Sequence, residues 1–139
     1  MKKLLVALLA LSAGAAFADG IVGKWRTVDD ETKKPKAIIS ITESGGTYSG
    51  RIVGLMPGVD ANCGECSGAQ KGKPLVGQTV LRGLKAEGGE YVGGKITDPK
   101  SGKVYSAKAK IVDGGKTLQV RGYLGVSVLG RTQTWSRVP

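Results

Sequence analysis

The 139-residue chain is predicted to be all-β, a single antiparallel up-and-down β-barrel of about eight strands. Short runs rich in Ile, Val, Thr and Tyr recur at regular spacing, and glycine-rich turns separate them. Beyond residue 20, no segment shows the apolar stripe of an amphipathic helix. A barrel is favoured over a sandwich because closure of the sheet removes its exposed edges.

The first eighteen residues are expected to form a cleavable signal peptide. Lys2 and Lys3 precede the unbroken apolar run Leu4–Leu11, and Ala16-Phe17-Ala18 provides a small-x-small cleavage pattern. The apolar run is shorter than the roughly 20 residues that span a bilayer. We therefore expect residues 1–18 to be removed and residues 19–139 to form one periplasmic or secreted domain with no transmembrane span.

Eight extended runs are interpreted as strands. The second and sixth runs show the alternation of half-buried strands most clearly, since Ala37, Ile39 and Ile41 share one face and Lys108 and Lys110 lie on the polar face of the other run. The expected strands are Ile21–Val28, Lys36–Thr42, Thr47–Met56, Leu75–Leu84, Tyr91–Thr97, Val104–Val112, Thr117–Tyr123 and Leu129–Val138.

Glycine-bearing turns separate several of these runs, at residues 43–46, 86–89, 98–102 and 113–115. Glycine supplies the positive φ of tight hairpins, and Pro99 presets a turn dihedral in the third of these segments.

The first and last runs carry both tryptophans of the chain, and they must pair if the barrel closes. Trp25 is then expected near Arg131 or Arg137, where a stacked guanidinium contributes about 0.5–2 kcal/mol. The indole and the arginines either line a ligand mouth or seal one end of the barrel. Of the two, the seal is the favoured interpretation.

Cys63-Gly64-Glu65-Cys66 lies in a long connection, roughly residues 57–74. A redox dithiol would need a helical context that is not visible here. A zinc site would have to use carboxylates such as Asp60 or Glu65, because the chain has no histidine and no other cysteine. Export to an oxidising compartment favours a structural disulfide between Cys63 and Cys66, which stabilises by about 2 kcal/mol on a loop-entropy model.

The domain resembles an exported bacterial family called domain of unknown function 2147. The resemblance implies a lipocalin-like barrel and no established catalytic residues, because the family has no assigned activity. The segments that carry it are Gly23-Lys24-Trp25-Arg26-Thr27-Val28-Asp29-Asp30, Tyr48-Ser49-Gly50-Arg51-Ile52, Pro74-Leu75-Val76-Gly77, Gly93-Gly94-Lys95-Ile96-Thr97-Asp98-Pro99, Arg121-Gly122-Tyr123 and Gly130-Arg131-Thr132-Gln133-Thr134-Trp135.

Catalysis is not indicated by the sequence. It lacks a phosphate loop, a nucleophile elbow and a metalloprotease motif, and the absence of histidine removes the usual general base. The acidic run Asp29-Asp30-Glu31 could bind a cation but is more typical of a solvated turn. We expect a non-enzymatic protein with no cofactor and no metal.

The excess of basic residues gives a formal net charge of +10, or +8 without Lys2 and Lys3. The lysines are dispersed along the chain, which favours a solubilising exterior; attraction to anionic envelope surfaces is the alternative. Aromatic residues are too few for a base-stacking surface, so nucleic acid is not an expected partner.

The favoured function is binding of a small apolar or amphipathic ligand in the cell envelope by a monomeric barrel. The lumen candidates are Trp25, Tyr105, Arg121 and Arg131. The alternative is a protein-interaction module, such as an inhibitor or an envelope accessory protein, that presents the Cys63–Cys66 loop. A hollow interior would favour the first function and a packed interior the second.

Overall fold

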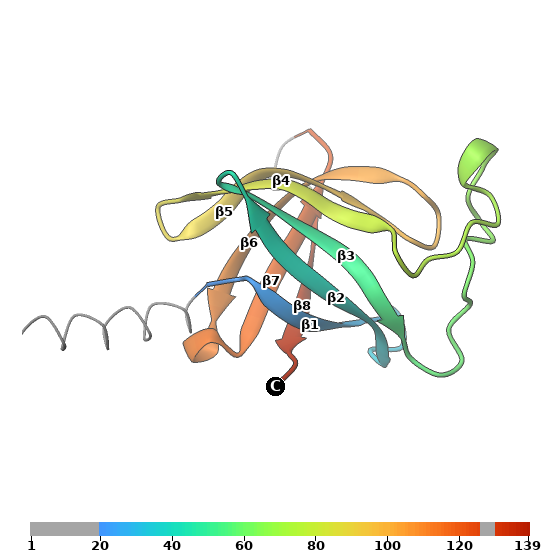
Figure 1. Ribbon diagram of the computed structural model, residues 1–139, viewed down its shortest axis with the longest axis horizontal. Helices are drawn as coiled ribbons and strands as arrows, with labels where there is room; N and C mark the ends of the chain where they lie inside the picture. The colour runs from blue at the N-terminus through green and yellow to red at the C-terminus, as the bar shows by residue number, and fades with distance from the viewer. Residues whose placement is uncertain (1–19, 126–129) are drawn as a thin grey trace, which may run out of the picture.

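The computed structural model describes residues 20–125 and 130–139, which form a closed antiparallel barrel (Figure 1). Each strand pairs with the next and the last pairs with the first, so the predicted up-and-down barrel is confirmed. The strands are β1 (Gly23–Val28), β2 (Pro35–Ser44), β3 (Thr47–Leu55), β4 (Thr79–Glu87), β5 (Glu90–Thr97), β6 (Val104–Val112), β7 (Thr117–Tyr123) and β8 (Gly130–Arg137).

Two short 3₁₀ turns, Gly68–Gln70 and Asp113–Gly115, complete the described structure. The expected signal peptide lies outside the described residues, as does Leu129, the expected first residue of the last strand. Within the described ranges, no helix is long and apolar enough to cross a membrane.

The turns at one end of the barrel are tight, as the glycines predict. Gly45 and Gly46 have φ values of 60° and 84°, and they join β2 to β3 directly between the paired residues Ser44 and Thr47. This is the two-residue turn whose twist matches that of the flanking strands. Since up-and-down connections alternate between the two ends, the longer loops all meet at the other end, which we call the mouth.

The strand bounds agree with the predicted ones to within two residues except at β4, which was expected over Leu75–Leu84 and runs over Thr79–Glu87. Leu75 is buried, but it anchors the end of a loop, where its N–H donates to the Ala61 carbonyl at 2.8 Å. Gly77 then turns the chain with a φ of 98° before the strand begins. The apolar pair Leu75-Val76 therefore lies in a loop, although its composition predicted the start of a strand.

The end opposite the mouth is densely packed, and we call it the closed end. The inward row of β2, which includes Ile41, is buried as its alternation predicts. Tyr48 of β3 and Tyr91 of β5 meet edge to face there, with ring centroids 5.0 Å apart. Leu84 and Leu118 are also fully buried. Their burial supplies the hydrophobic stabilisation of this half of the barrel.

The seam between β1 and β8 closes the barrel. Trp25 pairs with Arg137, and the N–H of Val138 donates to the Lys24 carbonyl at 2.9 Å. The guanidinium carbon of Arg137 lies 4.3 Å from the centroid of the Trp25 ring. Of the two arginines that sequence reasoning considered, the structure thus places Arg137 on the indole. Trp25 is completely buried, and its Nε1 donates to the Ile21 carbonyl at 2.9 Å.

Candidate functional site

The half of the barrel next to the mouth is hollow and encloses a cavity of about 620 Å³. The barrel is therefore packed at one end and hollow at the other. The apolar wall of the cavity is formed by inward residues of five strands and by the indole of β8. These residues are Ile39, Ile52, Val80, Ile96, Val120 and Trp135.

A chain of hydrogen bonds, which we call the polar relay, crosses one side of the cavity. Trp135 Nε1 donates to Gln133 Oε1 at 2.8 Å, and Gln133 Nε2 donates to Asp30 Oδ1 at 2.7 Å. Arg131 Nη1 then donates to Asp30 Oδ2 at 3.0 Å. The four side chains come from β8 and from the β1–β2 loop, and all of them line the cavity. The relay thus holds that loop against β8 at the mouth.

The electrostatics of the relay keep Asp30 ionised. Partial burial by itself raises the pKa of Asp30, but the hydrogen bonds from Gln133 and Arg131 together outweigh that effect and hold the pKa below its ordinary value. The hydrogen bond and the charge of Asp30 in turn raise the pKa of Arg131. The relay therefore presents a carboxylate that is already paired with a cation.

Charged side chains of three loops meet on another side of the mouth. Lys100 Nζ lies 3.9 Å from a Glu31 carboxylate oxygen and 3.8 Å from one of Glu65. These residues come from the β5–β6, β1–β2 and β3–β4 loops respectively, and all three line the cavity. Because these ion pairs are exposed, each contributes only about 0–1 kcal/mol and is weakened by salt.

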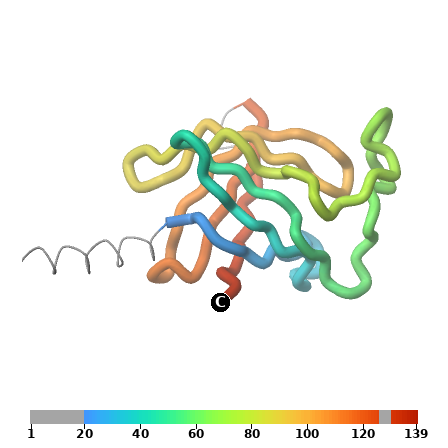
Figure 2. The backbone as a smooth tube through the Cα atoms, viewed as in Figure 1, coloured from blue at the N-terminus to red at the C-terminus, as the bar shows by residue number. Residues whose placement is uncertain are grey.

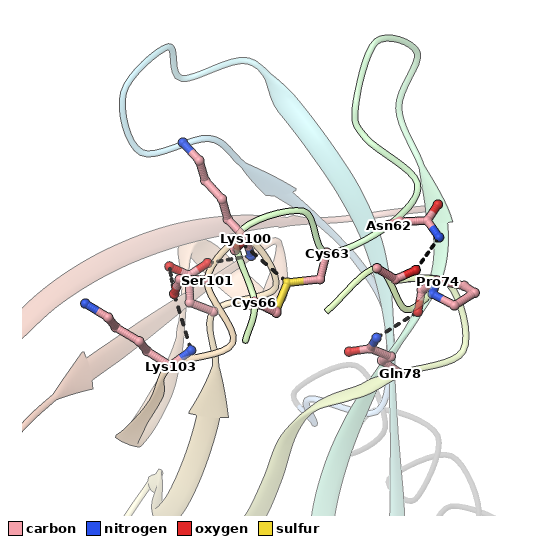
Figure 3. The surroundings of a disulfide bond; sticks show 10 residues. Asn62, Cys63, Cys66, Pro74, Gln78, Lys100, Ser101 and Lys103 are labelled. Atoms are coloured by element: carbon pink, nitrogen blue, oxygen red, sulfur yellow. Dashed lines mark hydrogen bonds between the residues drawn. A yellow bond between two sulfur atoms is a disulfide. The ribbon is translucent and has the colours of Figure 1, made fainter. Parts of the chain in front are cut away.

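The predicted disulfide between Cys63 and Cys66 is confirmed, with Cα atoms 5.5 Å apart. Both cysteines are buried against the β5–β6 loop, and Cys63 Sγ lies 3.5 Å from the carbonyl oxygen of Lys100 (Figure 3). A Cβ atom on Gly102 would lie only 2.9 Å from Cys66 Sγ. The disulfide therefore packs the long β3–β4 connection against the β5–β6 loop. This contact places Glu65 at the rim of the cavity.

Two of the four predicted ligand-binding residues line the cavity. Tyr105 and Arg131 are part of its wall. Trp25 lies outside the cavity lining, at the closed end. Arg121 also lies outside the lining, because it alternates with Val120 and Gly122, whose side of β7 faces the lumen. Arg121 donates a hydrogen bond to Thr132 Oγ1 at 2.8 Å on the neighbouring strand.

Sequence reasoning missed Gln133 and Asp30. Gln133 could have been found from its spacing, because Arg131, Gln133 and Trp135 fall on one side of a strand. The expectation of a solvated turn over Asp29-Asp30-Glu31 was wrong for Asp30, whose partners lie about a hundred residues further along the chain and are brought to it only by the β1–β8 seam.

A closed eight-stranded antiparallel barrel with one sealed end and one hollow end is a lipocalin-like barrel. The solved structure of protein HP1028 from the human pathogen Helicobacter pylori, described as belonging to the lipocalin family, is similar in fold. The TM-score is 0.75 at 20% sequence identity, over 87% of this chain and 84% of that chain.

The family described as an uncharacterized protein conserved in bacteria, DUF2147, matches residues 23–137, and the chain belongs to this family. The predicted family resemblance is confirmed. A search of curated proteins finds no match.

Proposed function

We propose that the protein binds a small apolar or amphipathic ligand in the hollow half of the barrel. The observation that carries this proposal is the cavity of about 620 Å³, which has an apolar wall and a polar relay on one side. Ligand sites are typically cavities of about 300–1,000 Å³ that combine an apolar lining with a few placed polar groups.

The cavity wall suggests how such a ligand would lie. Its apolar part would pack between Ile39, Ile52 and Val120. A polar group on the ligand would reach Arg131 of the relay or the hydroxyl of Tyr105. These are the two predicted ligand-binding residues that line the cavity. Burial of apolar ligand surface would supply most of the affinity, at about 25 cal/mol per Å².

We propose binding rather than catalysis because the polar groups of the relay are engaged with one another. Asp30 accepts hydrogen bonds from Gln133 and Arg131, so it is poorly placed to act as a base. Export to the periplasm or the exterior is part of the same proposal. Its support is the leader pattern of residues 1–18 together with the Cys63–Cys66 disulfide.

A cavity-filling variant tests the proposal. Val120→Trp places an indole in the lumen, whereas Val104→Trp places one on the outer surface of β6, where Val104 is exposed. With a dansyl-labelled fatty acid as the probe, we expect Val120→Trp to weaken binding about ten-fold or more (~1.4 kcal/mol). Val104→Trp should bind as the wild type does.

Circular dichroism and urea unfolding of both variants would show that the barrel is intact. Equal affinity of the probe for the two folded variants would contradict a site in the lumen. Native mass spectrometry of protein purified from its own cells provides an independent check, since a natural ligand would add a reproducible mass.

The second candidate is a protein-interaction module that presents the Cys63–Cys66 loop. The β3–β4 connection favours it, because this segment projects well beyond the strands (Figure 2) and its disulfide is anchored at its base. If this is the function, Val120→Trp should leave binding of the protein partner unchanged. Shortening of the exposed 67–71 segment should abolish that binding.

A further inference from the structure

Basic side chains that are dispersed along the sequence gather on the outer surface of four neighbouring strands, β4 to β7. We call this surface the basic face. Lys108 and Lys110 point outward because they alternate with the buried Ala107 and Ala109. The basic face comprises Arg82, Lys85, Lys95, Lys108, Lys110 and Arg121.

The register sets like charges beside one another on this face. Arg82 pairs directly with Lys95 on β5, and Lys108 pairs directly with Arg121 on β7. Like charges at opposed positions of a sheet destabilise it. Like charges set side by side in this way repel one another, and an anionic partner would reduce that repulsion.

Within residues 20–125 and 130–139, carboxylates do not pair with Lys95 or Lys108. The acidic residues of β4 to β7 are Glu87 and Glu90, which lie together beside the hairpin at the closed end. Among the described residues, ion pairs are formed by Lys100 and Arg131, both at the mouth, whereas Lys95 and Lys108 form none. The barrel thus has a basic wall, while several carboxylates gather around its mouth.

Two apolar side chains lie exposed at the mouth end of the same strands. Val104 begins β6 and is 46% exposed, and Leu124 directly follows β7 and is 62% exposed. The pairing of Ser106 with Tyr123 places the two at the same end of adjacent strands. An apolar rim next to a basic face is the combination that favours an anionic membrane interface.

We propose that the basic face docks on an anionic lipid bilayer. The lysines and arginines would lie among the lipid phosphates, and Val104 and Leu124 would enter the headgroup region. This orientation sets the β6–β7 side of the rim, which carries Val104 and Leu124, against the membrane. A bilayer fits better than nucleic acid, because the outward positions of the face lack a row of aromatic side chains on which bases could stack. Docking does not depend on occupancy of the lumen.

Vesicle flotation with the expected mature protein, residues 19–139, tests the proposal. We compare vesicles of phosphatidylcholine alone with vesicles that also contain phosphatidylglycerol. The wild type should bind only the anionic vesicles, and added salt should release most but not all of it. K95E/K108E should lower the partition coefficient about ten-fold or more.

The matched control is K24E/R51E, which changes the net charge equally on β1 and β3, where both side chains are exposed. It should retain binding within about three-fold of the wild type. Val104→Ser should reduce the binding that persists at high salt.

Equal losses in the two double variants would overturn the proposal, because net charge rather than the face would then decide binding. Equal binding to neutral and anionic vesicles would also overturn it. So would salt-dependent binding to duplex DNA by a wild type that ignores vesicles. Fatty-acid probe binding by K95E/K108E should remain at the wild-type level, so failure to dock and failure of the lumen site are distinguishable.

Discussion

The two tryptophans show that residue type alone does not determine the role of a side chain in the barrel. Trp25 and Trp135 both lie on inward rows of their strands and are both buried. Trp25 is covered by Arg137 and belongs to the sealed end, whereas Trp135 borders the cavity and donates its N–H to Gln133. The seal and the cavity wall are therefore built from the same residue type at neighbouring inward positions of the β1–β8 seam.

Trp25→Ala should destabilise the protein by about 3–5 kcal/mol, because it leaves a large void beneath Arg137 at the closed end. Urea unfolding followed by circular dichroism measures this loss. Val104→Ala, at an exposed position, should change the free energy of unfolding by less than about 0.5 kcal/mol. An unchanged melting temperature together with lost probe binding would instead make Trp25 a ligand contact.

The stabilisation by Asp30 should depend on pH. Its pKa is lower in the folded protein than the ordinary 3.8, so the folded state favours the carboxylate. The contribution is complete above that ordinary value and is lost as the pH falls through the lower folded-state pKa. The difference in urea midpoint between wild type and Asp30→Asn should therefore narrow in acid. A difference in urea midpoint that stays constant from neutral to strongly acid pH would contradict a lowered pKa of Asp30 in the folded protein.

At the scale of elements, the mouth is organised by contacts between loops. The β3–β4 connection is long, but the disulfide and the neighbouring pair Asn62 and Pro74 give it a defined base. That base rests on the β5–β6 loop at Gly102. Removal of this contact should therefore loosen two mouth loops together.

Gly102→Ala tests the contact, with Gly58→Ala as a matched control. Both glycines have positive φ, 79° and 86°, so each substitution incurs a backbone cost of about 1–2 kcal/mol. A Cβ atom at Gly58 meets nothing within 4 Å, whereas at Gly102 it meets Cys66 Sγ at 2.9 Å. We expect Gly102→Ala to lower the urea midpoint more than Gly58→Ala. Equal effects would show that the disulfide does not pack tightly on this loop.

At the scale of the whole molecule, the β1–β8 seam is the shortest junction of the barrel. Only Trp25 and Arg26 of β1 pair with residues of β8. Closure at this seam is nevertheless what brings Asp30 to Gln133 and removes the free sheet edges.

Hydrogen exchange should show this seam opening at a lower free energy than the β6–β7 pairing, where seven residue pairs are in register. The amides of both pairs of strands should nonetheless be protected relative to those of the β3–β4 connection. Mass spectrometry of peptides from β1 and β8 measures the difference. Exchange of β1 amides at the rate of the exposed loop would contradict a closed barrel.

Local pattern was sufficient for most of the fold. Alternation around Ile39 and glycine pairs such as Gly45-Gly46 act between near neighbours, so they predicted the strands and the tight turns. The predicted start of β4 was wrong because the apolar Leu75 is buried at the end of a loop and does not lie in a strand. Half of the predicted lumen residues do not line the cavity. Trp25 lies toward the closed end, which spacing does not reveal, and Arg121 alternates with Val120 and so lies on the outer side of β7.

The sequence by itself determined an all-β chain of about eight strands, the family resemblance and a disulfide within a short motif, because each depends on residues close together in the chain. Only the tertiary structure decided which half of the barrel is hollow, that Asp30 meets Arg131, and that dispersed lysines share one face. Those features arise from strands that closure sets side by side, and the distances between their residues are fixed by the register of the sheet.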